Sequence, residues 1–189
     1  RQDCSIMSNN ETTSGEDQVW LRLIQINDVY ELTNFPSFKT LCDEKSTGPD
    51  KVLIFLAGDF LAPSLLSALD KGRGMIDVLN TSGVTHVCFG NHETDVPDEH
   101  LAQRIEESDF TWLNTNMREV DEKLGCKTFP HEIVHVKHGD NISKKIALLG
   151  LMTEDSSLYR PDAFGCAKIE NLMETAEAYL PTLSEDIDM

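Results

Sequence analysis

Four side chains that can bind a divalent cation stand directly after three apolar segments of this chain. Asp28 follows LRLIQIN, Asp59 follows VLIFLAG, and Asn91 and His92 follow THVCFG. Asp28, Asp59 and Asn91 are separated by 31 and 32 residues, close to the roughly 30 residues of one strand–helix–strand unit. Carboxylate, amide and imidazole groups are common ligands of divalent cations in proteins. The pattern therefore predicts a metal site.

The three apolar segments have the length and composition of buried parallel strands. We expect strands over Trp20–Ile26, Val52–Ala57 and Val84–Phe89, because short apolar runs bounded by turn residues are typical of a sheet covered on both faces. Ligands of open α/β sheets bind outside the carboxyl ends of the strands. Parallel neighbours would bring the four polar side chains to that one edge.

Each of these residue types has a distinct use at such an edge. A carboxylate has two oxygens, so Asp59 can bridge two divalent ions about 3.5–4 Å apart, the spacing that serves phosphoryl transfer. Asp28 would be a terminal ligand of one ion, and Asn91 a neutral oxygen ligand of the other. His92 can donate a proton to a leaving oxygen, and Asp95 can hold its ring by a hydrogen bond. A single Asp after a strand is more often a turn or helix cap, so the prediction depends on the recurrence and on the GNHE run.

The remaining elements follow the same reading of periodicity and turn residues. Helices are expected near residues 36–44, 62–69, 75–83, from Pro97 onward and at 169–180, with a fourth strand over Trp112–Asn116. Alternation over Thr128–His138, a turn and a run over Lys145–Leu151 predict an antiparallel hairpin. Residues 1–16 are polar and aperiodic and are predicted to be a disordered lead-in. The domain is then expected over residues 17–189.

Composition narrows the classes of function. The 189 residues are 40% hydrophobic and 26% charged, as in ordinary globular proteins, and no apolar run approaches the ~18 residues of a membrane span. A formal net charge of −17 disfavours nucleic acid or an anionic membrane as a partner. The five scattered cysteines form no C-x-x-C pair, so we expect neither a zinc knuckle nor a disulfide framework. This cysteine pattern favours a cytoplasmic location, whereas the three N-x-S/T sequons at Asn10, Asn80 and Asn141 argue against it, so the location stays open. Because the first residue is Arg1, a signal peptide is neither indicated nor excluded.

Several segments together resemble a known family. INDVYEL, AGDF and FGNHETD resemble the first three signature blocks of the calcineurin-like metallophosphoesterases, D-x-H, G-D and G-N-H-D/E. MIDVLNTSGV, WLNTNM and LLGLMTEDS resemble the 5′-nucleotidase-like branch, so the resemblance covers about residues 19–160. It implies an α/β fold, an incomplete four-layer α/β/β/α sandwich with parallel βαβ units followed by an antiparallel hairpin.

The resemblance also implies a chemistry. Family members hydrolyse phosphoesters at a centre of two divalent metal ions, manganese, zinc or similar, and a small phosphoester is the implied substrate, with a nucleotide as one candidate. By this resemblance the metal ligands are Asp28, bridging Asp59 and Asn91. His92 with Asp95 resembles the catalytic His–Asp dyad of the branch.

Two departures from the family pattern matter. Tyr30 stands where the first block has its metal-binding His, and a neutral phenol with a pKa near 10 is a poor ligand for zinc or manganese, although a ferric ion could accept a phenolate. The fourth and fifth blocks, which supply further His ligands, are expected beyond residue 189, so the C-terminal half of the domain is an expected partner. We expect His131 and His135 to be exposed polar residues of the hairpin.

Three functions remain open from the sequence. The first is a metal-dependent phosphomonoesterase or nucleotidase of which this chain carries half of the site, so that the chain alone has little or no activity. The second is a non-catalytic interaction module with the same fold, which Tyr30 favours. The third is a nuclease of the same fold, which the acidic charge disfavours.

Overall fold

The computed structural model describes residues 18–139, 142–183 and 187–189, and its central feature is a parallel sheet of four strands. The strands are β1 (Leu21–Ile26), β2 (Lys51–Ala57), β3 (His86–Cys88) and β4 (Thr111–Leu113), in the order β1-β2-β3-β4. All three pairings are parallel, which confirms the predicted βαβ units. The predicted lead-in at residues 1–16 lies outside the described residues.

A separate antiparallel hairpin follows, as the alternating pattern predicted. It consists of β5 (Glu132–His138) and β6 (Ile142–Leu148). The α-helices are α1 (Phe35–Lys45), α2 (Leu65–Asp70), α3 (Arg73–Ser82), α4 (Asp98–Glu106), α5 (Val120–Leu124) and α6 (Leu172–Tyr179). Short 3₁₀ helices cover Asn91–Asp95, Ser156–Leu158, Ala163–Cys166 and Leu180–Thr182.

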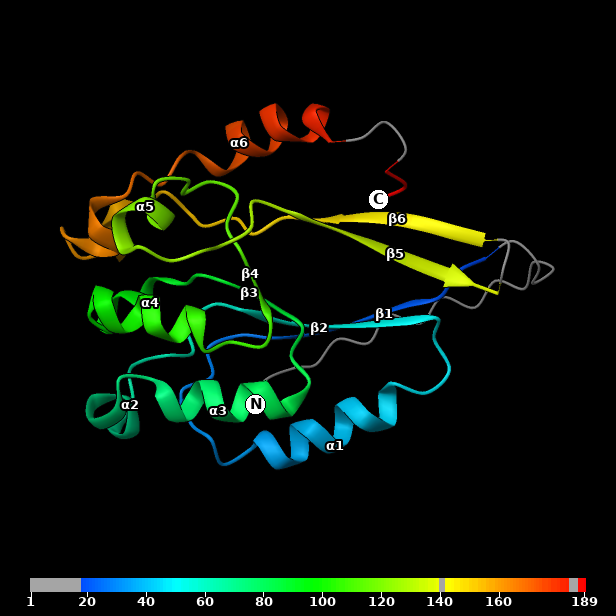
Figure 1. The fold of residues 1–189 in the computed structure, drawn as a ribbon, viewed down its shortest axis with the longest axis horizontal. Helices are drawn as coiled ribbons and strands as arrows, with labels where there is room; N and C mark the ends of the chain where they lie inside the picture. The colour runs from blue at the N-terminus through cyan, green and yellow to red at the C-terminus, as the bar shows by residue number, and fades with distance from the viewer. Residues whose placement is uncertain (1–17, 140–141, 184–186) are drawn as a thin grey trace.

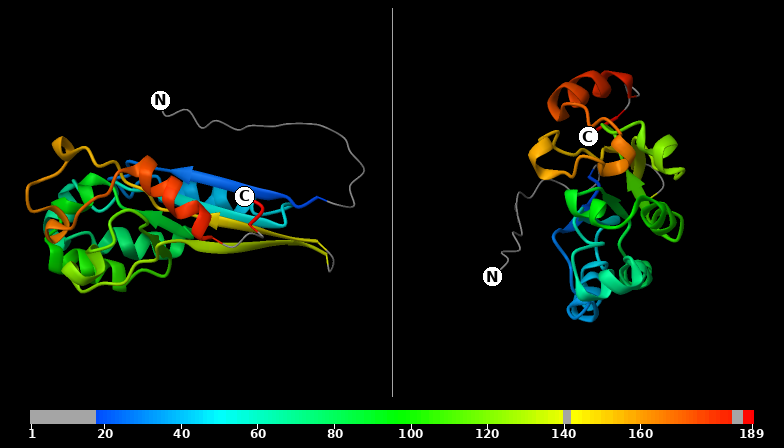
Figure 2. Two further views of the ribbon diagram at one scale, coloured as in Figure 1. Left: turned by 90° about the horizontal axis from the view of Figure 1, so that it is seen from above. Right: turned by 90° about the vertical axis from the view of Figure 1, so that its left-hand side faces the viewer.

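The elements are arranged in layers. In Figure 1, α1 and α3 lie below the parallel sheet, the β5–β6 hairpin lies above it, and α6 is outermost. The two views of Figure 2 show the same succession from other sides. This helix–sheet–sheet–helix order is the predicted α/β/β/α arrangement, with the hairpin as the second sheet among the described residues.

The apolar core explains why β2 is a continuous hydrophobic run. Ile54 and Leu56 belong to the cluster that contains Ile76 and Leu79 of α3, and all four are at most 5% exposed. Alternate residues of a strand point to opposite faces, so Leu53, which is also buried, points toward the hairpin. Both faces of β2 are covered, as the sequence predicted.

Two predicted strands are shorter in the structure, because residues beside them form hydrogen bonds outside the ladder of the parallel sheet. Before β3, the hydroxyl of Thr85 accepts the N–H of Ile54 at 3.0 Å, and a side chain that satisfies a backbone group in this way competes with the ladder. After β4, Asn114 N–H donates to the carbonyl of Phe129 at 2.8 Å and Thr115 N–H to that of Gly150 at 2.7 Å. The helix predicted from Ala62 begins at Leu65 instead, because the Ser64 side chain caps it by accepting the N–H of Ser67.

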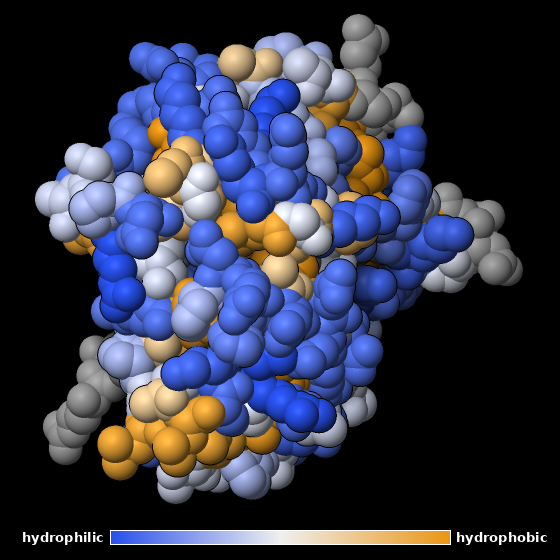
Figure 3. Space-filling model, turned by 60° about the vertical axis from the view of Figure 1, so that its left-hand side comes forward, coloured by the Kyte–Doolittle hydropathy of each residue, from blue (hydrophilic) through white to orange (hydrophobic). Residues whose placement is uncertain are grey.

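The surface is mostly hydrophilic with local apolar exceptions. Figure 3 shows a mostly hydrophilic face with apolar residues gathered at the lower left and smaller apolar groups near the centre and the upper right. The large exposed hydrophobic residues include Leu65 and Leu69 of α2, and Trp20 and Leu23 at the edge strand β1. An exposed apolar edge strand is a site at which another strand can pair. Within the part of the chain that the structure describes, no helix is long and apolar enough to cross a bilayer.

His86 connects the parallel sheet to the hairpin. Its side chain is buried in β3, with Nδ1 2.8 Å from Thr85 Oγ1 and Nε2 3.2 Å from Glu132 Oε2 of β5. Glu132 Oε2 also accepts a hydrogen bond from the hydroxyl of Thr111 at 3.0 Å. Burial lowers the pKa of His86, although the nearby Glu132 carboxylate acts in the opposite direction. The imidazole is therefore held neutral between the two layers.

Acidification is expected to destabilise the fold through His86. Because its pKa is lowered in the folded state, the unfolded chain takes up a proton first as the pH falls below the ordinary value of about 6.5, and stability falls with it. Urea unfolding midpoints at about pH 7.5 and about pH 5.5 measure this loss. His86→Gln should reduce the difference between the two midpoints, whereas His135→Gln, at an exposed position of β5, should leave it. An equal pH dependence in both variants would contradict the prediction.

Candidate functional site

The first three strands end level with one another at one edge of the sheet. Ile26 pairs with Leu56, and Ala57 pairs with Cys88, so the three loops that follow begin side by side. Asp28, Asp59 and Asn91 stand two or three residues into these loops. The expected juxtaposition at the carboxyl edge therefore follows directly from the parallel register.

Asp59 contacts the loops on both of its sides. Its carbonyl oxygen accepts the N–H of Val29 at 3.0 Å, and its carboxylate Oδ1 accepts the N–H of His92 at 2.8 Å. Asp59 has φ 59° and Asp28 has φ 54°, a left-handed conformation that is uncommon for residues other than glycine. Such strained backbone persists where surrounding contacts enforce it, and here the neighbouring loops supply those contacts.

Glycines allow the second and third loops to touch. A Cβ at Gly90 would lie 2.2 Å from Asp59 Oδ1, and a Cβ at Gly58, which has φ 75°, would lie 2.6 Å from Gly90 N. Both distances are too short for any side chain. The glycine that precedes Asp59 and the glycine that precedes Asn91 are therefore required by this close approach.

A buried carboxylate, that of Glu93, joins the same two loops. Its Oε2 accepts the N–H of Asp59 at 2.9 Å and that of Gly90 at 2.6 Å. Its Oε1 accepts the N–H of Phe60 at 2.9 Å and that of Leu61 at 3.2 Å. Burial raises the pKa of Glu93, and the four backbone donors act in the opposite direction. The sequence marked this residue only as part of the GNHE run, and its role as the tie between loops was missed.

His92 and Asp95 form a hydrogen-bonded pair. His92 Nδ1 lies 2.8 Å from Asp95 Oδ2. Because an ionised carboxylate can only accept, Nδ1 carries the proton of this bond and Nε2 is the ring nitrogen left for reaction. The bond to Asp95 raises the pKa of His92, with partial burial acting against it. The other oxygen of Asp95 accepts a hydrogen bond from Arg160 Nη2 at 2.6 Å, a contact that the sequence did not indicate.

Tyr30 hydrogen-bonds to Asp28 at the first of the two predicted metal positions. Its hydroxyl donates to Asp28 Oδ1 at 3.1 Å, and the side-chain amide of Asn27 donates to Oδ2. Burial, followed by the charge of Asp59, raises the pKa of Tyr30 above that of an ordinary phenol, so the side chain is a neutral donor. Its ring meets the His92 ring edge-on, with centroids 5.7 Å apart.

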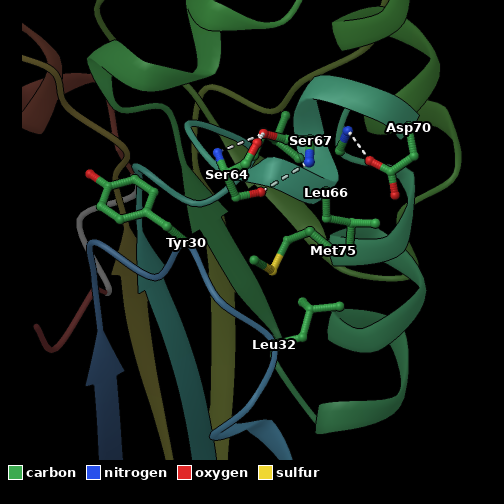
Figure 4. Close-up of a pocket in the computed structure, with 9 residues that line it drawn as sticks. Tyr30, Leu32, Ser64, Leu66, Ser67, Asp70 and Met75 are labelled. Atoms are coloured by element: carbon green, nitrogen blue, oxygen red, sulfur yellow. Dashed lines mark hydrogen bonds between the residues drawn. The ribbon is translucent and has the colours of Figure 1, made fainter.

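Two cavities lie beside these residues. The first, lined by Tyr30, Ser64 and Met75 among others, has a volume of about 10 Å³, room for at most one water. Figure 4 shows that the Tyr30 hydroxyl points away from Ser64 and Met75. The second cavity, about 470 Å³, is lined by the segments Thr94–Asp98 and Arg160–Cys166. Only the second has the size of a small-molecule site.

The two predicted metal positions differ in how well their side chains suit a cation. Among the described residues, neither Oδ2 of Asp59 nor the side-chain amide of Asn91 has a hydrogen-bond partner, and such oxygens suit magnesium or manganese. Both oxygens of Asp28 already accept hydrogen bonds. No three His, Cys, Asp or Glu residues within the described ranges are grouped to hold a metal ion. The second position therefore fits a cation in part, and the first does not.

The other histidines lie elsewhere. His135 and His138 are exposed on β5, and His138 Nδ1 is 2.7 Å from Asp50 Oδ1. His131 is partly buried, with Nδ1 2.7 Å from the hydroxyl of Tyr179. The exposure predicted for His135 is confirmed, while His131 instead contacts α6.

Solved structures share this arrangement. A 5′-nucleotidase precursor from Thermus thermophilus superposes with a TM-score of 0.66 at 18% identity, over 89% of this chain and 35% of its own. The NAD nucleotidase NadN of Haemophilus influenzae gives 0.66 at 20% identity, over 87% and 36%. The calcineurin-like phosphoesterase YfkN of Bacillus subtilis gives 0.60 at 17% identity, over 87% and 58%. The chain has the calcineurin-like metallophosphoesterase fold.

The match to the metallophosphoesterase fold is partial in length and rests on structure. This chain spans about a third of the length of the two nucleotidases and 58% of YfkN. No protein-family model and no curated protein sequence matches the chain. The fold expected from the INDVYEL, AGDF and FGNHETD segments is confirmed by this likeness.

Replacing the buried carboxylate should loosen this part of the metallophosphoesterase fold. Glu93→Gln turns an amide NH₂ toward two backbone N–H donors, so we expect a loss of about 2–4 kcal/mol in the free energy of unfolding, measured by urea titration. Glu122→Gln, at an exposed position of α5, should change it by less than about 0.5 kcal/mol. Equal stability of the two variants would show that Glu93 does not hold the loops.

Placing an imidazole at position 30 should improve metal binding. Tyr30→His removes the donor to Asp28 and adds a nitrogen ligand, so we expect the Kd for Mn²⁺ or Zn²⁺ to fall by roughly 10-fold or more in calorimetric titrations. Tyr30→Phe removes the hydroxyl without adding a ligand and serves as the matched control. The prediction is wrong if the His variant binds no more tightly than the Phe variant.

Proposed function

We propose that this protein hydrolyses phosphoesters in a metal-dependent reaction of the phosphomonoesterase or 5′-nucleotidase type, at a centre of two divalent ions. The observation that supports it most is the convergence of Asp59, Asn91 and the His92–Asp95 pair at one edge of the sheet. Several solved structures of the same fold bear the names of nucleotidases and a phosphoesterase. A small phosphoester, with a nucleotide as one candidate, is the corresponding substrate class.

The proposed roles of the side chains follow from their contacts. Asp59 would hold the cations through its oxygens, assisted by Asn91 on one side and Asp28 on the other. Divalent ions supply positive charge against the phosphoryl oxygens of a substrate. His92, whose Nδ1 is bonded to Asp95, presents Nε2 and can give a proton to the leaving oxygen.

We further propose that the described residues carry only part of the metal ligands. Asp28 and Tyr30 are hydrogen-bonded to each other, and the described residues contain no group of three titratable ligands. The solved nucleotidases are about three times as long as the matched region. Residues that correspond to the C-terminal half of the metallophosphoesterase domain would then complete the site.

A non-catalytic role is the second candidate. The observation in its favour is Tyr30, whose hydroxyl occupies Asp28 where a metal-binding His would otherwise stand. A protein of this kind would keep the fold and use its surface to bind a partner. The two candidates differ in whether phosphoester turnover depends on Asp59.

An assay of aryl phosphate and nucleoside monophosphate hydrolysis in Mn²⁺ or Zn²⁺ tests the proposal. The 189-residue chain alone should bind metal weakly and show little or no turnover. In a form extended by the residues that complete the domain, turnover should appear and Asp59→Asn should lower it by roughly 100-fold or more, because a ligand to the cations is lost.

Two results would overturn these proposals separately. Binding of two ions by the 189-residue chain with a Kd below about 1 µM, together with steady turnover, would contradict the half-site. An extended form that binds metal yet hydrolyses neither substrate would contradict catalysis and favour the interaction module. Asp77→Asn, at an exposed position of α3, is the matched control for Asp59→Asn.

A further inference from the structure

Arg160 makes a contact that the sequence-based assignment of the site does not include. Its Nη2 donates to Asp95 Oδ1 at 2.6 Å, while the other oxygen of the same carboxylate, Oδ2, accepts from His92 Nδ1 at 2.8 Å. Asp95 is thus held from two sides. The three side chains form a continuous line from Arg160 through the carboxylate to the imidazole.

The backbone around Arg160 is anchored independently of this contact. The hydroxyl of Tyr159 donates to the carbonyl of Thr153 at 2.7 Å, and its ring lies 6.3 Å from that of Phe164. Phe164 is fully buried, with its ring centroid 5.3 Å from that of Phe89, immediately after β3. The segment is therefore packed onto the strand that leads into the GNHE loop, which brings Arg160 to Asp95.

The cavity beside Arg160 is lined by several acidic residues. Arg160 lines the cavity of about 470 Å³ together with Asp95, Asp98 and Asp162. Arg160 is the one basic residue among the lining residues, which include three carboxylates. Among the described residues, Arg160 and His92 are the side chains that hydrogen-bond to the Asp95 carboxylate.

The ion pair between Arg160 and Asp95 is too exposed to contribute much to the stability of the fold, but it can still orient the Asp95 side chain. The Arg160 side chain is 60% exposed and that of Asp95 25%, and pairs in such contact with solvent contribute little to folding. Fixing a carboxylate that in turn fixes an imidazole has a different effect, because it selects the ring tautomer and the direction of the free nitrogen. A role in geometry is therefore what these contacts favour.

We propose that Arg160 is a positioning residue for the His92–Asp95 pair. It holds the Asp95 carboxylate so that Oδ2 keeps accepting from Nδ1, which leaves Nε2 as the ring nitrogen without the proton. The catalytic use of this arrangement rests on the proposed phosphoester hydrolysis, whereas the arrangement itself is a property of the chain and can be measured without turnover.

Nitrogen-15 NMR of the full 189-residue chain, labelled at its histidine rings, tests the proposal. At alkaline pH, where the imidazole is neutral, the wild-type His92 ring should show Nδ1 protonated and Nε2 bare. Arg160→Gln should shift the ring signals toward the mixture of tautomers of an unconstrained histidine. Arg160→Lys keeps a cation that can reproduce the single contact, and it should retain most of the wild-type pattern.

The matched control is Arg118→Gln, which removes the same charge from an exposed position against the Tyr179 ring. It should leave the His92 signals unchanged, and all three variants should unfold at the urea midpoint of the wild type. The proposal is overturned if Arg160→Gln leaves the tautomer unchanged, if Arg118→Gln shifts it equally, or if the Lys variant behaves like the Gln variant. Loss of phosphoesterase activity in an extended form would bear on the proposed function and would leave this result standing.

Discussion

The geometry of the site depends on one carboxylate that never reaches the surface. Glu93 is fully buried and accepts four backbone N–H groups, two from Asp59 and Gly90 and two from Phe60 and Leu61. A buried carboxylate is tolerated only when its oxygens are well satisfied, and here the donors belong to the loops after β2 and β3. The bonds that satisfy Glu93 are thus the same bonds that hold Asp59 beside Asn91.

This tie accounts for the unusual backbone around it. Asp59 has a positive φ, and Gly58 and Gly90 approach so closely that neither can carry a side chain. Strain of this kind costs about 1–3 kcal/mol per residue, which charge-assisted hydrogen bonds to Glu93 can offset. The outcome is asymmetric, because Asp59 and Asn91 keep unused oxygens while Asp28 is engaged by Asn27 and Tyr30.

Much of this fold could be predicted from the sequence because its signals are local. The apolar runs that end at Asp28, Asp59 and Asn91 defined the strands, their spacing defined the parallel units, and the alternation before His138 defined the hairpin. The strands β3 and β4 were predicted too long, because the hydroxyl of Thr85 and the backbone N–H of Asn114 form hydrogen bonds outside the ladder of the parallel sheet. No periodicity in the sequence reveals these bonds. The five residues of α5 are too few for a periodic pattern.

For the candidate site, the sequence predicted only the order along the chain of the candidate metal ligands. The role of Glu93 requires knowing that its side chain turns inward, and the contact of Arg160 with Asp95 joins residues 65 apart through an irregular segment. Tyr30 was recognised as a departure, yet its hydrogen bond to Asp28 came from the structure. Residues that recur at strand ends can be recognised in the sequence. A contact between residues far apart in the chain, such as that of Arg160 with Asp95, cannot.

Anomalous diffraction from crystals of this chain soaked in Mn²⁺ at high concentration would test most directly whether these loops build a metal position. The structure leads us to expect the strongest anomalous peak within coordination distance of Asp59 and Asn91, and a weaker peak or none between Asp28 and Tyr30. A peak centred on Asp28 and Tyr30, or no peak at Asp59, would contradict the account.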